Sequence, residues 1–229
     1  LEVHFFLPHL AYAEIDSMIF FPTLLLSLKV KRNYKALFFS IGITAPIFLV
    51  WDFIATWVGS WSFNHKWVLG IYVIDLPIEE VLFFVVTPFA TLLIYDFLRT
   101  KVKDSTLNAF SRRNMVIVAV ALLLLSILAI KHSYTFVDLI YASLSIIFVE
   151  LLDEDLFKSR NYWVFLLLTY IPFLVFDHFL TSLPVVIYGH CSIIGIRVFS
   201  IPIEDFIYSF SMMNFYTLFY RRGSRIWIG

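Results

Sequence analysis

The sequence predicts an all-α membrane protein with seven transmembrane helices, arranged as two parallel three-helix repeats joined by a linker helix. The first supporting observation is composition: 61% of the 229 residues are hydrophobic, 15% are charged and the mean hydropathy is +0.87. A soluble domain is only about 45–50% apolar, so the surplus apolar side chains face something other than water. The second and third supporting observations are the lengths of the apolar segments and an internal duplication.

Each apolar segment is predicted to be a helix, because a single segment in lipid must satisfy its own backbone hydrogen bonds. The predicted spans cover residues 5–28, 36–58, 77–98, 115–130, 134–152, 162–181 and 202–220. Most approach the roughly 20 residues needed to cross a bilayer. The fourth is the shortest and has no acidic residue. Two longer connections, 59–76 and 182–201, contain many aromatic residues, which favours either interfacial anchoring or a lid over a cavity.

The basic residues predict the orientation. All Lys and Arg residues except Lys66, Lys131 and Arg197 lie at segment ends that share one side of the predicted membrane. Positive residues concentrate on the cytoplasmic face. We therefore expect an integral protein of the cell membrane, in contact with lipid, with its N-terminus outside and its C-terminus in the cytoplasm.

A four-residue motif occurs twice. Pro77-Ile78-Glu79-Glu80 returns 125 positions later as Pro202-Ile203-Glu204-Asp205. The same offset, without a gap, pairs Phe48 with Phe173, Asp52 with Asp177 and Gly70 with Gly195. This indicates an internal duplication. The predicted units are a first three-helix repeat (1–99), a linker with the fourth helix (100–132) and a second repeat (133–229). A shift by four spans keeps the chain direction, so the repeats are parallel.

Acidic residues form one layer in the outer part of the predicted membrane, roughly 20–30 Å along the helices from the basic ends. They are Glu14, Asp16, Asp52, Glu79, Glu80, Asp138, Asp177, Glu204 and Asp205. No lysine shares this layer within a span. Ionisable groups inside a membrane are costly and usually functional. We expect acids without cationic partners to hold protons, as general acid–base chemistry requires.

A simpler interpretation of each motif is helix initiation. Proline suits the first helical position, and acids in the first turn interact favourably with the helix dipole. This accounts for one motif, but less well for two aligned copies that each have an aspartate, Asp52 or Asp177, 25 positions before the proline.

Aromatic residues surround the acids. The candidate substrate-binding residues are Trp51, Phe53, Trp57, Phe83, Phe84, Phe176, Phe206 and Tyr208. Phe83 follows Glu79 by four residues and Phe84 follows Glu80 by four, so each ring shares a helix face with an acid. Rings around a protonated acid suit a reaction through a carbocation, which π faces stabilise and water would quench.

Other site classes lack support. Cys191 is the only cysteine, the histidines have no metal-ligand spacing, and there is no phosphate-binding loop. We therefore expect no metal, flavin or nicotinamide. The run 153–155 is interpreted as a solvated turn rather than a magnesium site. The formal net charge of zero gives no reason to expect nucleic-acid binding.

The duplicated Pro-x-Glu-(Glu/Asp) motif in seven predicted spans resembles the membrane-integral lycopene cyclases, in which two subunits, or two halves of a fused chain, correspond to the two repeats. The resemblance implies redox-neutral cyclisation of lycopene to β-carotene without a cofactor. An acid protonates C2 of an end group, the C5–C6 double bond attacks the C1 cation, and loss of the C6 proton completes the ring. On this basis Glu79 and Glu204 are the expected acids, with Glu80, Asp205, Asp52 and Asp177 as partners or bases.

Several alternatives remain open. A relative could cyclise C50 carotenoids, form an ε- or γ-ring or hydrate the end group, since all begin with the same cation. A small-solute transporter of three-plus-one-plus-three topology would show the same spans, but most asparagines here lie in loops or at the cytoplasmic end. A retinal-binding protein needs a lysine in its last span, and 202–220 has none. The sequence determines neither which repeat supplies the acid nor the oligomeric state.

Overall fold

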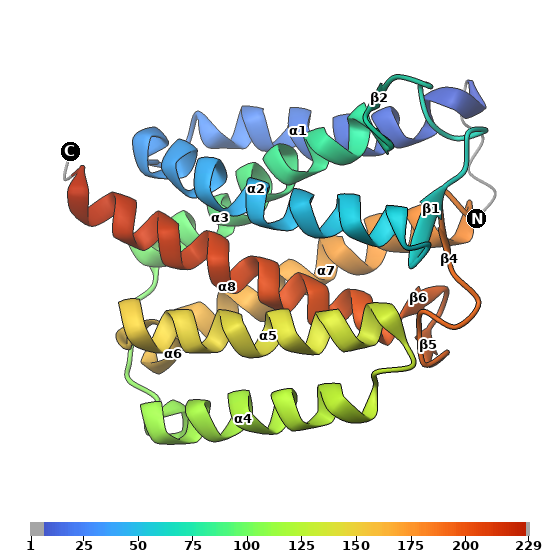
Figure 1. Ribbon diagram of the computed structural model, residues 1–229. Coiled ribbons are helices and arrows are strands. Elements are labelled where there is room, and N and C mark those ends of the chain that lie inside the picture. The colour runs from blue at the N-terminus through green and yellow to red at the C-terminus, as the bar shows by residue number, and fades with distance from the viewer. Residues whose placement is uncertain (1–6, 228–229) are drawn as a thin grey trace.

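The computed structural model describes residues 7–227 as a bundle of long helices (Figure 1). The long helices are α1 (Ala11–Ser27), α2 (Tyr34–Trp57), α3 (Ile78–Lys101), α4 (Arg112–Leu128), α5 (Ser133–Leu152), α7 (Arg160–Ser182) and α8 (Ile203–Ile226). Shorter turns are η1 (Pro8–Leu10), η2 (Asn108–Phe110) and α6 (Asp155–Lys158). Each long helix overlaps one predicted apolar segment, although the predicted start at residue 5 lies outside the described residues.

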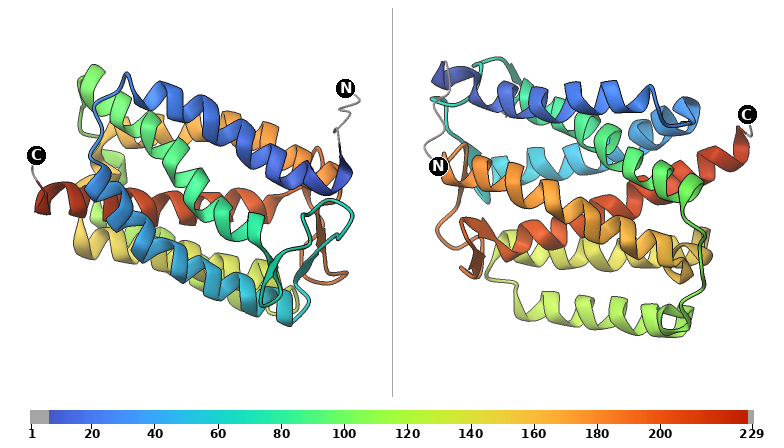
Figure 2. Two further views of the ribbon diagram at one scale, coloured as in Figure 1. Left: turned by 90° about the horizontal axis from the view of Figure 1, so that it is seen from above. Right: turned by 180° about the vertical axis from the view of Figure 1, so that it is seen from behind.

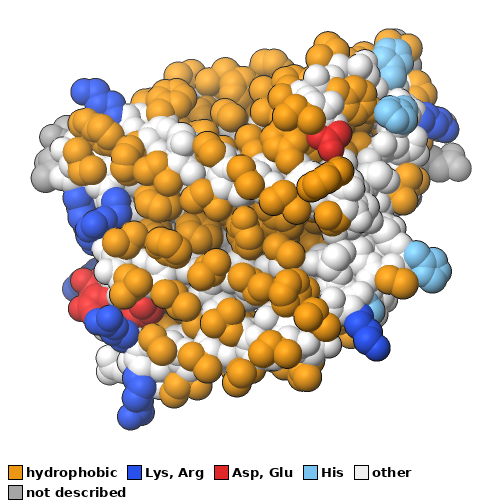
Figure 3. Space-filling model, viewed as in Figure 1, with side chains coloured by type: hydrophobic (Ala, Val, Ile, Leu, Met, Phe, Trp, Pro, Cys, Tyr) orange, Lys and Arg blue, Asp and Glu red, His pale blue; other side chains and the backbone are white. Residues whose placement is uncertain are grey.

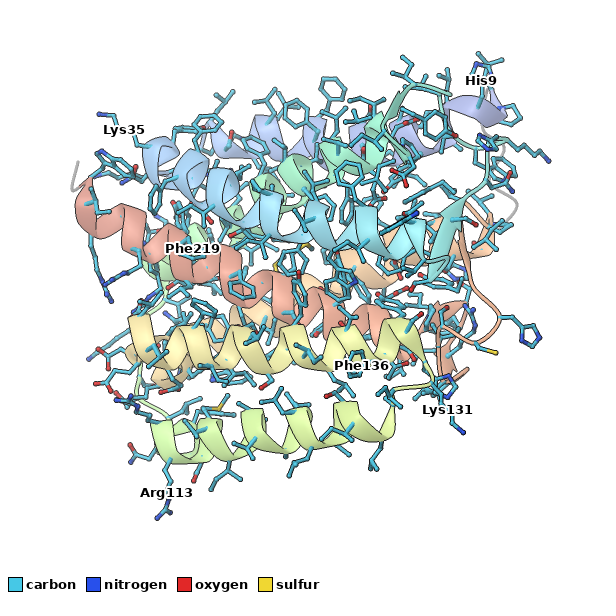
Figure 4. All side chains as sticks on the ribbon, viewed as in Figure 1. His9, Lys35, Arg113, Lys131, Phe136 and Phe219 are labelled. Atoms are coloured by element: carbon cyan, nitrogen blue, oxygen red, sulfur yellow. The ribbon has the colours of Figure 1, made fainter. Side chains whose placement is uncertain are left out.

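Within residues 7–227, five helical segments are long and apolar enough to cross a membrane: Pro8–Ser27, Tyr34–Trp57, Ile78–Lys101, Ser133–Leu152 and Arg160–Ser182. Helices α4, with 17 residues, and α8, which has charged residues at both ends, do not meet the same criteria. Apolar side chains cover the middle of the visible face, while Lys and Arg gather mainly at the end near the C-terminus (Figure 3). In Figure 4, Lys35 and Arg113 lie at this end and His9 and Lys131 at the other. These are features of an integral membrane protein.

The helix packing interleaves the two duplicated segments (Figure 2). Helix α1 packs along α3, and α5 packs along α8. In contrast, α2 packs along α8 of the second copy, and α7 packs against α3 of the first. Helix α4 lies outside the bundle beside α5. Between α2 and α8, the ring centroid of Phe48 lies 5.3 Å from that of Tyr208 and 6.0 Å from that of Phe215. The core is therefore shared by both copies.

Short strands, which the sequence did not predict, organise the two apolar connections. Strand β1 (Trp61–Phe63) pairs antiparallel with β4 (Val186–Tyr188) and so joins the connections to each other. Strands β2 (Tyr72–Val73) and β3 (Leu76–Pro77) form one hairpin, and β5 (Arg197–Val198) and β6 (Ile201–Pro202) form its counterpart. The resulting cap lies over one end of the bundle (Figure 1).

The two hairpins have the same backbone conformation at positions 125 residues apart. Ile74 (φ 60°) and Phe199 (φ 58°) occupy the left-handed region, which is strained for a non-glycine residue. The hairpins then place Pro77 and Pro202 in an extended conformation immediately before α3 and α8. Each motif therefore starts its helix at the edge of the cap.

At the opposite end, Asp153 ties the α5–α6 junction to α8. Its carboxylate accepts two hydrogen bonds from Arg221, at 2.6 and 3.1 Å, and one from Arg225 at 2.7 Å. The prediction of a fully solvated turn at 153–155 is therefore wrong for Asp153, which is buried. Burial acts to raise the pKa of Asp153, but the hydrogen bonds and charges of Arg221 and Arg225 hold it below its ordinary value.

We expect Asp153→Asn to destabilise the protein at neutral pH by about 1.5–3 kcal/mol, the range for a hydrogen bond to a charged group. Because the folded-state pKa is depressed, this stabilisation is present above the unfolded value of about 3.9 and is lost as the pH falls through the folded value. Thermal unfolding in detergent should therefore give a lower Tm for the variant at pH 7 and a smaller difference below about pH 4. An unchanged difference at low pH would contradict this account.

The control is Glu154→Gln, because Glu154 is exposed and its ion pair with Lys158, at 3.7 Å, lies at the surface. Such a pair contributes about 0–1 kcal/mol, so the Tm of this variant should remain close to that of the wild type.

Candidate active site

One cavity of about 450 Å³ lies between α1, α3, α7 and α8, and Asp52 reaches it from α2. This volume is within the range of about 300–1,000 Å³ usual for small-molecule pockets. Met18 lines the cavity and is also 50% exposed, so the cavity reaches the apolar surface of the bundle beside α1. Aromatic residues make up much of the wall: Tyr12, Trp61, Phe63, Phe83, Tyr134, Phe173, Phe176, Tyr188 and Tyr208.

The first pair of acids at the cavity is Asp52 on α2 and Glu80 on α3. The two carboxyls are close enough to share a hydrogen bond. Tyr12 on α1 donates to Oε2 of Glu80 at 2.6 Å, and Tyr208 on α8 donates to Oδ1 of Asp52 at 3.2 Å. Because a carboxylate only accepts hydrogen bonds, a bond between two carboxyls requires a proton on one of them. The pair is therefore built to hold a proton.

The second pair is Asp177 on α7 and Asp205 on α8, which are also close enough to share a hydrogen bond. Tyr134, at the start of α5, donates to Oδ1 of Asp205 at 2.7 Å, and Tyr188, on β4, donates to Oδ2. The rings of Tyr134 and Tyr188 are stacked, with centroids 5.9 Å apart. In the described part of the chain, Oδ2 of Asp177 accepts no hydrogen bond from a hydroxyl or N–H group.

Glu79 and Glu204 are buried but are not among the residues that line the cavity. Oε1 of Glu79 accepts a hydrogen bond from the backbone N–H of Leu69 at 2.6 Å. Oε1 of Glu204 accepts one from the backbone N–H of Ile194 at 2.8 Å and another from the hydroxyl of Thr135 at 2.6 Å. The two acids thus make equivalent contacts with the two connections of the cap.

Asp16 and Asp138 are buried beside these pairs but do not line the cavity. Their carboxyl oxygens have no hydrogen-bond partner among the residues that the structure describes. An unpaired charge is costly in an apolar interior, so burial favours the neutral form of both side chains.

The predicted substrate-binding aromatics occupy different environments. Phe83, Phe176 and Tyr208 line the cavity, whereas the other five candidates do not. Trp51 and Phe84 are buried in the shared core, Phe206 packs against Phe173 with ring centroids 4.9 Å apart, and Phe53 is half-buried. Trp57 is 82% exposed. The cavity is lined by aromatic side chains, as predicted, but several of these residues are not among the predicted ones.

Three phenols that bond the acid pairs were missed by the sequence prediction: Tyr12, Tyr134 and Tyr188. A signal existed for two of them, because Tyr12 precedes Asp16, and Tyr134 precedes Asp138, by four residues. That spacing places both members of each pair on one helix face. Tyr188 gave no such signal, because its position follows from the pairing of β4 with β1.

Comparison with known proteins gives one family. The family model for lycopene cyclase matches residues 9–98 and 131–222, which make up more than half of the chain. The two matched segments each contain one Pro-Ile-Glu motif and agree with the internal repeat. No curated protein and no solved structure gives a significant match.

The contacts of Glu79 and Glu204 predict a local change on substitution. In Glu204→Ala the backbone amide of Ile194 should exchange with solvent faster, by up to about tenfold, because the amide loses its acceptor and a hydrogen bond contributes about 0.5–1.5 kcal/mol. Glu79→Ala should have the same effect at Leu69. Hydrogen–deuterium exchange in detergent measures both.

The internal control is the amide of Gly189, which donates to the carbonyl of Ser60 at 2.9 Å within the same cap. Its exchange should not change in either variant. Unaltered exchange at Leu69 and Ile194 would contradict a role for these carboxylates in holding the cap.

Proposed function

The chain belongs to the lycopene cyclase family, and we propose that it converts linear lycopene to β-carotene by redox-neutral cyclisation of the end groups within the membrane. Family membership implies a carotenoid cyclase. The observation that carries the proposal is a single aromatic cavity into which two pairs of buried carboxyls project, with no lysine or arginine among its lining residues. Such a cavity offers a proton, a proton acceptor and ring faces to an apolar substrate.

The proposed topology is seven spans in two parallel three-helix repeats, with α4 returning the chain across the membrane. The distribution of charge supports an outer cap and a cytoplasmic C-terminus, since the basic residues gather at the end remote from the cap. The N-terminus is then outside. The proposed acid layer lies beneath the cap.

We assign proton transfer to Asp52 and Glu80. One carboxyl donates its proton to C2 of an end group, which leaves a cation at C1. The C5–C6 double bond supplies the electrons for the new C1–C6 bond, and the positive charge moves to C5. The other carboxyl then removes the C6 proton, and the electrons of that C–H bond form the C5–C6 double bond of the β-ring. The pair ends with as many protons as it had at the start.

This assignment differs from the sequence-based expectation that Glu79 and Glu204 supply the protons. The oxygens of Glu79 and Glu204 that make hydrogen bonds are directed at the cap, and neither residue is part of the cavity wall. We therefore propose that they are positioning residues, which hold the cap over the site. Phe63 and Tyr188 of the cap line the cavity, which supports the lid interpretation of the two connections.

The cavity walls suit a cationic intermediate. The faces of Trp61, Phe83 and Tyr208 provide π electrons that stabilise positive charge by about 0.5–2 kcal/mol each. Exclusion of water prevents capture of the cation, which would give a hydroxylated end group.

The opening beside Met18 supports entry of the substrate from the lipid between α1 and α7, since residues of both helices line the cavity. Extended lycopene is about as long as the hydrocarbon core of a bilayer, about 30 Å. We infer that one end group at a time occupies the cavity while the rest of the polyene lies in lipid.

Expression of the chain in lycopene-accumulating cells should change the pigment from red to yellow-orange, with β-carotene as the bicyclic product. Monocyclic γ-carotene should appear first, because the second end reacts only after release and re-entry. Product analysis over time after a pulse of lycopene measures both. Persistence of lycopene with well-folded protein in the membrane would sink the proposal, and ε- or γ-rings would correct the ring type.

Glu80→Gln and Asp52→Asn should each lower turnover by about 10²–10⁴, the usual contribution of general acid–base catalysis. The matched control is the neighbouring Glu79→Gln, which keeps an acceptor for the Leu69 amide and should lower turnover much less. Turnover in detergent with lycopene compares the three. A reversed result, with Glu79→Gln inactive and Glu80→Gln near normal, would return the acid role to Glu79.

A further inference from the structure

Two of the differences between the two halves of the cavity are phenol hydroxyl groups near the acids. The offset of 125 residues aligns Tyr188 with Phe63 and Tyr208 with Phe83, and all four side chains line the cavity. In both places the second copy has a phenol where the first copy has a plain ring. The acid pairs are therefore alike in position but differ in the hydrogen-bond donors around them.

The two extra hydroxyls bond different acids: Tyr188 donates to Asp205, whereas Tyr208 donates to Asp52. Asp205 thereby has two phenol donors. Each oxygen of its carboxylate accepts a phenol, from Tyr134 and Tyr188, and Asp177 is close enough to donate as well. A proton on either oxygen of Asp205 would compete with a hydroxyl that already donates to it. The site is thus formed for a carboxylate that accepts hydrogen bonds and not for one that exchanges protons.

The first pair lacks this arrangement. Glu80 accepts one phenol, from Tyr12, because Phe63 stands where the second phenol would be. Asp52 accepts a longer bond of 3.2 Å from Tyr208, and its Oδ2 accepts no hydrogen bond from a hydroxyl or N–H group among the described residues. A proton in this pair has free positions to occupy, which suits a group that donates and accepts protons in turn.

We propose that Asp205 is a fixed countercharge for the carbocation, held as an anion by the positioning residues Tyr134 and Tyr188, and that Asp177 keeps its proton throughout. This inference rests on the proposed cyclisation. A negative charge already oriented in an apolar cavity stabilises developing positive charge without reorganisation of solvent. Asp205 and Glu80 line the same cavity, so the countercharge lies in the cavity where the proposed proton transfer generates the cation.

A countercharge and a base have different consequences when they are removed. If Asp205 were the base that removes the C6 proton, its loss would still allow protonation of the substrate at C2. The ring cation would then lose a different proton, from C4 to give an ε-ring or from the C5 methyl group to give a γ-ring. Loss of the countercharge raises the barrier to cation formation itself. Consumption of lycopene then slows, while the proton lost, and therefore the ring type, stays the same.

The experiment compares purified wild type with Asp205→Asn in D₂O, with lycopene as substrate. Three quantities are measured: the rate of lycopene consumption, the ring type of the product, and deuterium in recovered lycopene. We expect Asp205→Asn to slow consumption by about 10²-fold or more, with unchanged ring type and no deuterium in recovered substrate. A wild-type rate, a change of ring type or deuterium in recovered lycopene would each overturn the proposal.

Two further variants keep the carboxylate but weaken its support. Tyr134→Phe and Tyr188→Phe should each slow consumption by less than Asp205→Asn, and the double variant should slow it by more than either, again with unchanged ring type. The control is Tyr170→Phe, whose hydroxyl donates to the carbonyl of Phe206 at 2.9 Å. Among the described residues, the hydroxyl of Tyr170 does not donate to a carboxyl of either acid pair. This variant should consume lycopene at the wild-type rate.

If Asp205→Asn does not fold, the same measurements on the double variant Tyr134→Phe/Tyr188→Phe test the countercharge role of Asp205. A double variant with the wild-type rate or an altered ring type would overturn the proposal. Failure of the proposed function is distinguishable, because wild-type protein would then form no cyclic product at all. If the wild type forms cyclic product and Asp205→Asn forms it at the same rate, the countercharge role of Asp205 is disproved and the proposed cyclisation stands.

Discussion

The burial of acids in an apolar bundle constrains the rest of this structure. Asp52, Glu79, Glu80, Glu204 and Asp205 are all at most 9% exposed, and a buried acid must be neutral, paired or hydrogen-bonded. No cation is available at the cavity wall. The chain meets the requirement with phenols, backbone N–H groups and protons shared between carboxyls. Each of these partners fixes the place of a helix or connection, so the acids organise the half of the molecule beneath the cap.

The interleaved packing explains why both copies are needed for each half of the site. Asp52 and Glu80 belong to the first copy, but Tyr208, which bonds Asp52, comes from α8 of the second. Strand β4 of the second copy pairs with β1 of the first, and this pairing carries Tyr188 to the cavity. One copy alone would leave carboxyls without donors and the cavity without part of its wall.

Duplication also provides two acid pairs where one proton-transferring pair is sufficient. In a fused chain each copy is encoded separately, so the Tyr/Phe differences at positions 63 and 188, and at 83 and 208, need not be matched in the other copy. These Tyr/Phe differences between the two copies change the packing little, because tyrosine and phenylalanine have similar shapes. It changes the hydrogen bonding of the acids, and with it the chemistry each pair is suited for.

The sequence by itself determined the helical class, the segments that form helices, the duplication and the family, because apolar length and a repeated spacing are local properties of the chain. It also predicted a layer of nine acids, of which seven are buried, while Glu14 and Asp177 are half-buried. Only the tertiary structure shows that Glu80 lines the cavity and Glu79 does not. Neighbouring residues on a helix point about 100° apart, and the packing of α3 selects which of them faces the cavity. The contribution of Tyr188 likewise depends on the pairing of β4 with β1, two distant segments, and no local pattern encodes this pairing.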